Sequence, residues 1–198
     1  MRKYSVIILI LVLLSSCAVK PLVTNQYKLG AFSKKQLTKT PSKHSIFVNM
    51  PDAVAGYQGE EMLYTVKAYE LTPFVHSAWV DQPAEMLLPL IIQSLQRSGY
   101  FHVVASSPGA EVTEYRIDTQ LIELHQSFLT KPSTLHFVVK TVLVRVEDNH
   151  VIASRIFSYV VPCPADTPYG GVLAANQASQ LFTAALTKFV INHIRSAG

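Results

Sequence analysis

The spacing of apolar side chains predicts a helix between Pro83 and Gly99. Apolar positions recur there every three or four residues, as on a helix with one buried face. The stripe expected to be buried consists of Leu87, Leu90, Ile91, Ser94 and Leu95. Pro83 suits the first turn, Asp81 lies beside the positive end of the helix dipole, and Gly99 can end the helix in a left-handed cap. Pro89 removes one backbone hydrogen bond, so we expect a kink there or a later helix start.

A second helix is predicted from about Val172 to Arg195. Its buried side should be formed by the residues at helical spacing, which are Ala178, Leu181, Phe182, Ala185, Leu186, Phe189 and Val190. Gly170 and Gly171 precede it, where free backbone N–H groups could bind an anion. No strand, lysine or downstream acid completes a phosphate-binding loop, so a simple helix-initiating turn is the favoured interpretation of the two glycines.

Strict alternation of apolar and polar side chains predicts a strand from Tyr115 to Leu124. One face carries Tyr115, Ile117, Thr119 and Leu121, and the other carries Arg116, Asp118 and Gln120. This pattern indicates a sheet with one face in water. Residues 135–146 and 151–161 are predicted to form a hairpin around the turn 147–150. The first of these arms is apolar on both faces, so it is either a central strand or lies against another subunit.

Shorter apolar segments complete the predicted sheet. Strands are expected at residues 27–32, 45–50, 61–69 and 101–105, with loops at residues 33–44 and 106–109. The fold class that follows is α+β in a single domain. It has a mixed, mostly antiparallel β-sheet with two helices packed on one face.

The start of the chain has the three parts of a bacterial lipoprotein signal. Met1-Arg2-Lys3 is cationic, residues 4–14 are apolar, and Leu14-Ser15-Ser16-Cys17 resembles a lipobox. An ordinary secretory signal needs no cysteine just after the cut, and an uncleaved membrane anchor would need about 20 apolar residues. The predicted organisation is a signal peptide at residues 1–16, a tether lipidated on Cys17 at residues 17–26, and a folded domain at residues 27–198.

The lipid on Cys17 would hold the chain at a membrane. Each buried methylene of an acyl chain such as palmitate adds about 0.8 kcal/mol, and two or more chains anchor a protein stably. Ala18 follows the cysteine, where an aspartate would retain a lipoprotein in the inner membrane under the sorting rule of enteric bacteria. By that rule the expected location is the inner leaflet of the outer membrane, facing the periplasm.

Charge gives no indication of nucleic acid as a partner. The net charge is +4, and it falls by two to +2 when Arg2 and Lys3 leave with the signal peptide. Positive charge concentrates near the anchor, where a solvated linker is favoured over contact with anionic headgroups. The lysines concerned are Lys20, Lys28, Lys34, Lys35, Lys39 and Lys43.

The sequence contains no catalytic or metal-binding motif. Histidines do not pair at the spacing of a zinc-binding helix, and Gly-x-Ser-x-Gly is absent. His125 and His136 could face each other across paired strands, where satisfied sheet histidines are favoured over metal ligands. Once Cys17 is lipidated, Cys163 has no partner in the chain, so a half-buried thiol is expected, with an intersubunit disulfide as the alternative. We predict no enzymatic activity, no metal and no cofactor.

Aromatic side chains gather in two stretches punctuated by proline and glycine, at residues 51–79 and 162–171. The candidates for binding a partner or ligand are Tyr57, Tyr64, Phe74, Trp79 and Tyr169. Aromatic residues in loops beside a rigid sheet often serve binding, but they also often pack over sheet edges. The sequence leaves both interpretations open.

The order of these motifs resembles that of the ABC-type transport auxiliary lipoproteins, which include the lipoprotein of the paraquat-inducible intermembrane system. The similarity covers most of the chain after the signal peptide. It is carried by the lipobox, Tyr27-Lys28-Leu29-Gly30, Ile46-Phe47-Val48, Ala55-Gly56-Tyr57, Met62-Leu63-Tyr64, Trp79, and the leucine-rich helix up to Gly99-Tyr100-Phe101. The long polar loop 33–44 and the Pro-Cys-Pro segment depart from the family's pattern.

The resemblance implies a non-enzymatic role. Such lipoproteins are outer-membrane partners of periplasmic mammalian-cell-entry-domain proteins, which form lipid tunnels and work with an inner-membrane permease and ATPase. Some members form rings, so subunit contacts within a homo-oligomer would suit the two-sided apolar strand. The alternative is a stand-alone lipoprotein that binds a lipid or another hydrophobic ligand in a pocket. A lipid-modifying hydrolase is a third, least favoured option.

Overall fold

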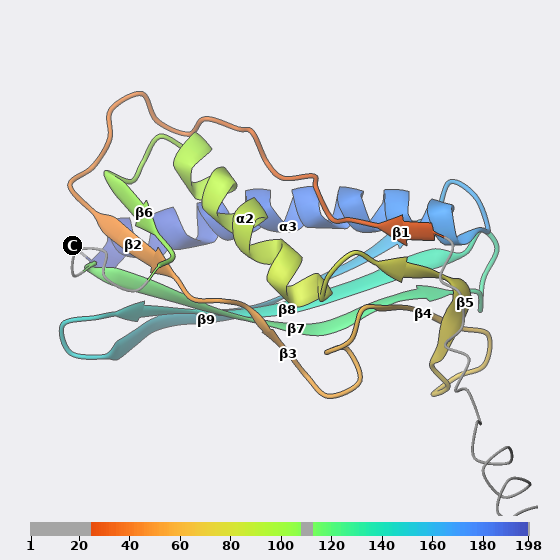
Figure 1. Ribbon diagram of the computed structural model, residues 1–198. Helices are drawn as coiled ribbons and strands as arrows, with labels where there is room; N and C mark the ends of the chain where they lie inside the picture. The colour runs from red at the N-terminus through yellow and green to blue at the C-terminus, as the bar shows by residue number, and fades with distance from the viewer. Residues whose placement is uncertain (1–24, 108–112, 198) are drawn as a thin grey trace, which may run out of the picture.

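The computed structural model describes residues 25–107 and 113–197. The predicted signal peptide, Cys17 and most of the predicted tether lie outside these residues. The described part forms a nine-stranded mixed sheet with helices α2 (Pro83–Arg97) and α3 (Pro168–Ala197) on one face (Figure 1). The strands are β1 (Asn25–Tyr27), β2 (Ser45–Val48), β3 (Asp52–Ala53), β4 (Glu61–Thr65), β5 (Thr72–Trp79), β6 (Val103–Ala105), β7 (Tyr115–Ser127), β8 (Thr134–Arg145) and β9 (His150–Pro162). The predicted α+β fold class is confirmed.

Strand β7 organises the sheet because both of its edges are paired along almost its whole length. On one edge, the short strands β2, β3 and β4 follow one another, all parallel to β7. Their registers include the pairs Ile46 with Tyr115, Asp52 with Gln120 and Leu63 with His125. On its other edge, β7 pairs antiparallel with β8. Pairing continues outward from β2 to β6 and from β4 through β5 to β1.

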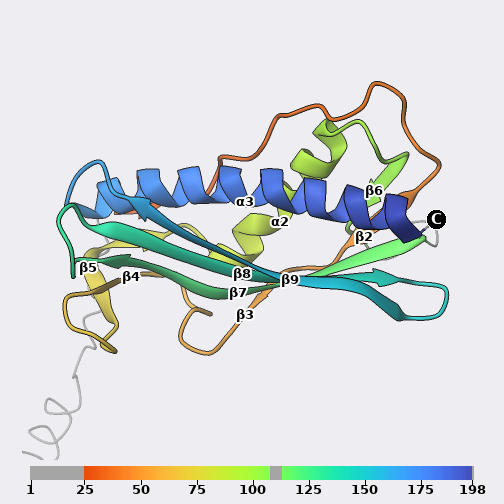
Figure 2. The same ribbon diagram turned by 180° about the vertical axis from the view of Figure 1, so that it is seen from behind.

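The long hairpin β8–β9 forms the other side of the sheet (Figure 2). The hairpin was predicted, and of the two alternatives for its first arm the structure shows the central strand, since β8 pairs with both β7 and β9. The alternating side chains of β7 behave as expected, since Tyr115, Ile117 and Leu121 are buried. Among the described strands, β9 pairs only with β8, so one edge of this 13-residue strand has no partner strand.

Helix α2 begins at Pro83 and continues through Pro89 to Arg97, so the later start considered from the sequence is wrong. All five residues of the predicted stripe are buried. Gly99 follows the helix with a φ of +72°, the left-handed conformation predicted for it. A Cβ at this glycine would lie 2.5 Å from the carbonyl oxygen of Thr38, so loop 33–44 closes over the helix end at this position.

Helix α3 begins one turn earlier than predicted because Thr167 caps it. The hydroxyl of Thr167 accepts a hydrogen bond of 3.1 Å from the N–H of Gly170, and Pro168 occupies the first helical position. A Cβ at Gly171 would lie 2.5 Å from Oε1 of Gln126, so the glycine lets the helix approach β7 closely. Within the described residues, no helix combines the length and the apolar composition needed to cross a membrane.

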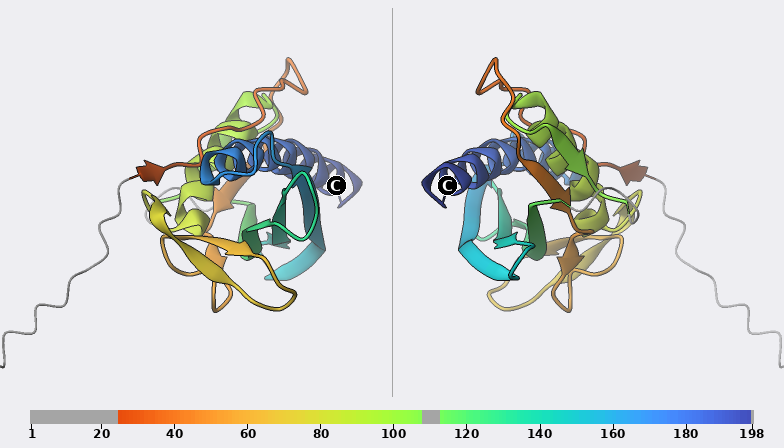
Figure 3. Two further views of the ribbon diagram at one scale, coloured as in Figure 1. Left: turned by 90° about the vertical axis from the view of Figure 1, so that its right-hand side faces the viewer. Right: turned by 90° about the vertical axis from the view of Figure 1, so that its left-hand side faces the viewer.

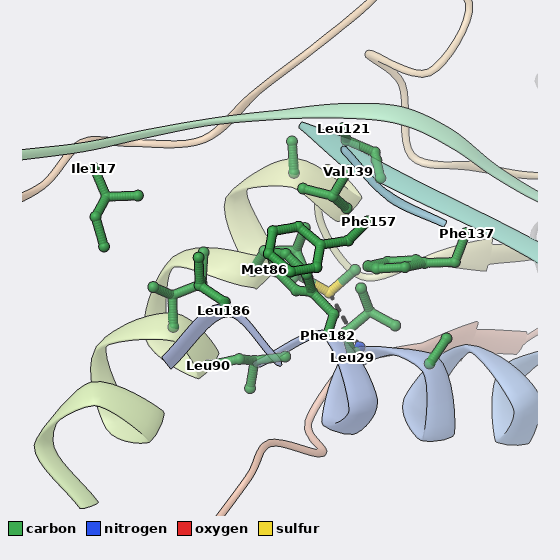
Figure 4. Close-up of a cluster of buried hydrophobic side chains, with 14 of the residues drawn as sticks. Leu29, Met86, Leu90, Ile117, Leu121, Phe137, Val139, Phe157, Phe182 and Leu186 are labelled. Atoms are coloured by element: carbon green, nitrogen blue, oxygen red, sulfur yellow. Dashed lines mark hydrogen bonds between the residues drawn. The ribbon is translucent and has the colours of Figure 1, made fainter. Parts of the chain in front are cut away.

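The core fills the space between the helices and the sheet (Figure 4). Phe137 and Phe157 extend from the hairpin towards Phe182 of α3, with ring centroids 5.8 and 5.4 Å from that of Phe182. Met86 brings α2 to the segment after β1, where its sulfur accepts the N–H of Leu29 at 3.4 Å. Leu181 does not join the core, contrary to prediction, and is 44% exposed.

Strands β1 and β4 differ from their predicted bounds, and strands β3 and β5 were not predicted. Strand β4 ends at Thr65 and not at residue 69. The first strand covers Asn25–Tyr27 instead of residues 27–32, because it forms only where it pairs parallel with β5. Strand β5 was not predicted, since Pro73, His76 and Ser77 interrupt its apolar pattern. Pairing with β4 on one side and β1 on the other holds it in an extended conformation. Strand β1 thus includes Asn25 and Gln26, the last two residues of the predicted tether.

Candidate functional site

The predicted candidate residues lie in separate parts of the fold. The hydroxyl oxygen of Tyr57 lies 3.0 Å from Nδ1 of His125, whose ring stacks on that of His136 at 5.0 Å between centroids. The two histidines therefore face each other across β7 and β8, as predicted. Burial, reinforced by the Glu123 carboxylate, raises the pKa of Tyr57 to about 12. Burial and the neighbouring His136 lower the pKa of His125 below 6.5, against the opposite effect of Glu123.

Tyr64 and Phe74 lie on strands β4 and β5 and not in loops. Their rings are 4.5 Å apart, and both contact Phe128, at 6.0 and 6.4 Å between centroids. Trp79 also lies on β5 and is buried in the core. Tyr169 is 56% exposed in the first turn of α3, beside Tyr27. These aromatic residues do not form one common surface, and their role in binding stays a prediction.

Cys163 is more buried than expected. Its backbone N–H donates to the carbonyl oxygen of Ser133 at 2.8 Å, and burial raises the pKa of its thiol. A thiol that is only 3% exposed cannot readily meet a second subunit, which argues against an intersubunit disulfide. No group of three or more histidine, cysteine or acidic side chains within residues 25–107 and 113–197 could hold a metal ion.

A surface groove lies between the free edge strand β9 and helix α3. It has a volume of about 540 Å³ and is lined by Arg155, Tyr159, Leu181, Ala184, Ala185, Lys188, Phe189, Asn192 and His193. The hydroxyl of Tyr159 donates to the carbonyl oxygen of Leu181 at 3.3 Å, which joins the strand to the helix at the base of the groove. The Arg155 guanidinium lies 5.0 Å from the centre of the Phe157 ring. The exposed Leu181 therefore belongs to this groove.

The other face of β9 exposes two apolar side chains that alternate with serines. Ile156 and Val160 are 59% and 58% exposed there, on the sheet face opposite α3. Their direct partners on β8 are Lys140 and His136, while Val138 and Val142 lie half-buried on the same face, opposite Ser158 and Ser154. We call Arg155, Ile156, Tyr159, Val160, Leu181 and Phe189 together the β9 edge surface. An uncapped edge strand with apolar side chains on both sides is a favourable surface for contact with another molecule.

The charge of this region has one sign. No residue of β9 or α3 is aspartate or glutamate, while Arg155, Lys188 and Arg195 are cationic. Acidic or neutral partners are therefore favoured at the β9 edge surface. Sequence reasoning missed this site because it followed aromatic residues in proline- and glycine-rich stretches. The absence of acidic residues from both segments was the signal that could have indicated it.

Solved structures share this fold. Protein XCC0632 from Xanthomonas campestris matches with a TM-score of 0.78 and 17% identity, over 88% of this chain and 98% of that one. An uncharacterized protein matches with a TM-score of 0.68 and 14% identity, over 85% and 99% of the two chains. The hypothetical protein CT253 from Chlamydia trachomatis has a TM-score of 0.53 and 11% identity, over 75% and 98%. None of the curated proteins matches the sequence significantly.

The family comparison covers most of the fold. The model of the ABC-type transport auxiliary lipoprotein component matches residues 27–187, from the end of β1 into the last turns of α3. This range includes helix α2, strand β9, helix α3 up to Thr187, and every residue of the β9 edge surface except Phe189. The resemblance noted in the sequence motifs is thus confirmed, and the chain belongs to the family of ABC-type transport auxiliary lipoproteins.

Proposed function

We propose that this protein is a non-enzymatic docking component of an ABC-type intermembrane lipid transport system. Cys17 carries the lipid that anchors it in the inner leaflet of the outer membrane, and the folded domain faces the periplasm. There the domain holds the distal end of a mammalian-cell-entry-domain protein, while a separate permease and ATPase act at the inner membrane. Membership of a transport auxiliary lipoprotein family supports the general role.

The observation that carries this proposal is a filled interior combined with an apolar outer edge. Two partly enclosed pockets within the described fold measure about 10 Å³ each, which is about the space of one water molecule and far too small for an acyl chain. Apolar side chains are exposed instead at the β9 edge surface, where Ile156 and Val160 are more than half exposed. An outer patch of this kind suits contact with a protein better than storage of a ligand.

Co-purification tests the partner and the surface together. Wild-type protein extracted in detergent is expected to retain the mammalian-cell-entry-domain protein, and Val160→Glu is expected to lose most of it, because the new carboxylate would be desolvated in the contact. Val75→Glu is the matched control, since Val75 is an exposed valine on strand β5, on the other side of the sheet. Equal unfolding midpoints of the two variants ensure that only the surface differs.

Each result of this experiment has a defined meaning. If the wild type retains no mammalian-cell-entry-domain protein, the proposed partner is wrong. If Val160→Glu retains as much partner as Val75→Glu, the partner binds elsewhere and the β9 edge surface is not the docking site.

A second candidate function is favoured by the shape of the groove. Its volume of about 540 Å³ is within the range of ligand sites, most of its lining is apolar, and Arg155 and Lys188 are among the residues that line it. An anionic lipid would fit this combination, with its headgroup near the two cations. Native mass spectrometry of protein released without detergent tests this role. A bound phospholipid that disappears in Leu181→Glu, but remains in Val75→Glu, would favour lipid binding over protein docking.

A further inference from the structure

The turn from β4 into β5 lies at one end of the domain, the end that faces the viewer in Figure 3, left, and exposed apolar side chains gather there. The turn between these strands carries Val66, Tyr69 and Leu71, which are 58%, 108% and 44% exposed. Leu129, 54% exposed, lies in the loop 128–133 between β7 and β8. The two segments are neighbours, because Thr65 pairs with Ser127 and the N–H of Phe128 donates to the carbonyl oxygen of Thr65 at 2.9 Å.

Tyr69 is held away from the rest of the protein by its backbone. Its φ is +68°, a conformation that residues with a side chain rarely adopt, and the N–H of Glu70 closes the turn by donating to the carbonyl oxygen of Lys67 at 3.2 Å. The aromatic cluster of Tyr64, Phe74 and Phe128 supports the base of both loops. A tyrosine has an apolar ring and a polar hydroxyl, which suits the boundary between headgroups and acyl chains.

The first strand runs from this same end of the domain. Strand β1 is parallel to β5, with Asn25 beside Ser77, so the first residue of β1 points back towards the end of the domain where β5 begins (Figure 1). Eight steps along the chain separate Cys17 from Asn25 and span at most about 29 Å at about 3.6 Å each. The five steps of β5 from Ser77 back to Thr72 cover about 17 Å. The lipidated residue is therefore within reach of the β4–β5 turn.

The opposite end of the domain has a different character. It is formed by the β8–β9 turn, whose exposed residues are Glu147, Asp148, Asn149 and His150. Arg145 binds Asp148 there through an ion pair of 2.7 Å. A turn of charged and polar groups gains nothing from contact with acyl chains and would have to lose water.

From these observations we infer that the β4–β5 turn and the loop 128–133 lie against the membrane that holds the lipid anchor, with Tyr69, Leu71 and Leu129 in its interfacial layer. The inference rests on the proposed anchoring at Cys17 and adds the orientation of the domain. Charges at this end balance, since Lys67 and Lys131 are matched by Glu70 and Asp166. Apolar contact and not attraction to anionic headgroups thus holds this end, and the contact should be insensitive to salt.

Fluorescence quenching of a label at residue 69 tests this orientation in the full lipidated chain. Tyr69→Cys would offer the accessible thiol for an environment-sensitive dye, because Cys163 is buried and Cys17 carries the lipid. Leu129→Cys is a second test position, and Glu147→Cys at the polar end is the control. Vesicles contain phosphatidylethanolamine and phosphatidylglycerol, with a nitroxide-labelled phospholipid as the quencher. Labels at positions 69 and 129 are expected to be quenched several-fold more strongly than the label at position 147, at low and at high salt.

Equal quenching at all three positions would overturn the inferred orientation. So would shielding of positions 69 and 129 from aqueous iodide without quenching by the nitroxide lipid, because another protein copy would then cover these loops. Either result together with normal co-purification of the partner leaves the proposed function intact. Protein that does not stay on the vesicles at all would overturn the anchoring on which both proposals depend.

Discussion

The side chain of Asn176 on helix α3 holds the backbone at Gly30, with its Oδ1 accepting the Gly30 N–H at 2.8 Å. The same oxygen accepts the N–H of Ala31 at 3.0 Å, and the amide nitrogen donates to the carbonyl oxygen of Lys28 at 3.1 Å. Further along the same segment, the N–H of Ser33 donates to the hydroxyl of Thr183, also on α3, at 2.9 Å. The segment that follows β1 is thus fastened along α3, so a load on the proposed lipid anchor would reach the core of the domain through these bonds.

Replacement of Asn176 tests this attachment. Asn176→Ala is expected to lower the free energy of unfolding by about 1–3 kcal/mol, because two N–H groups and one carbonyl group of the segment 28–31 lose their partners. Gln177→Ala is the matched control, since Gln177 is the adjacent amide and is exposed. Urea unfolding measures both variants. Equal losses would mean that the attachment contributes nothing to stability.

The close approach of loop 33–44 to the end of α2 can be tested at two glycines with positive φ. Gly99→Ala is expected to destabilise the fold by more than the roughly 1–2 kcal/mol that the left-handed conformation costs alone, because its Cβ would press on the carbonyl oxygen of Thr38. Gly56→Ala has a φ of +94° but no atom within 4 Å of the new Cβ, so it isolates the conformational cost. Thermal unfolding measures both variants. An equal loss of stability in Gly99→Ala and Gly56→Ala would show that the contact with Thr38 adds no steric cost.

The stability of the domain is expected to fall as the pH falls below about 6.5, because His125 has a lowered pKa in the folded state. As the pH drops through 6.5, His125 of the unfolded chain binds a proton first, while that of the folded chain stays neutral, so protonation favours unfolding. Urea midpoints from about pH 7.5 to pH 5 measure the slope. His125→Gln should flatten it. An unchanged slope in that variant would assign the pH dependence to other groups.

Thiol counting tests Cys163 and Cys17 in one experiment. Cys163 is buried, and burial raises the pKa of its thiol, so a thiol reagent should react with the folded protein far more slowly than with the unfolded protein. In denaturant the protein purified from its membrane should show one thiol per chain, because the proposed lipid would occupy the sulfur of Cys17. A second reactive thiol would show that Cys17 is unmodified, and rapid reaction of the folded protein would contradict the burial of Cys163.

The elements that could be predicted are those whose signals lie within one segment. Alternation from Tyr115 to Leu121 marks β7, and Pro83 and Gly99 mark the two ends of α2. Strands β1, β3 and β5 have no comparable signal, because distant partners hold them in extended form. Thr167 and Pro168 form a recognisable start signal for α3. The predicted start was nevertheless placed at Val172, because Gly170 and Gly171 were interpreted as the turn before the helix.

The candidate site also depends on contacts between segments that the sequence of one segment does not reveal. The sequence placed Trp79 and Phe74 in loops, as candidates for binding. Both lie instead on β5, which pairs with β4, and there Trp79 is buried and Phe74 is half-buried. Leu181 was assigned to the core from its helical spacing, since nothing in the helix itself shows that β9 stops short of covering it. The β9 edge surface depends on which strand lies last in the sheet, and this is a property of the topology.

The proposed function depends on contact between the β9 edge surface and a periplasmic component of a transport system. Photo-crosslinking in living cells tests it most directly, with a photoreactive amino acid in place of Ile156 and, as the control, in place of Val75, which is similarly exposed on β5. Position 156 is expected to crosslink to a mammalian-cell-entry-domain protein, identified by mass spectrometry, and position 75 is not. Crosslinks from position 156 only to a second copy of this chain, or the same product from both positions, would contradict the claim.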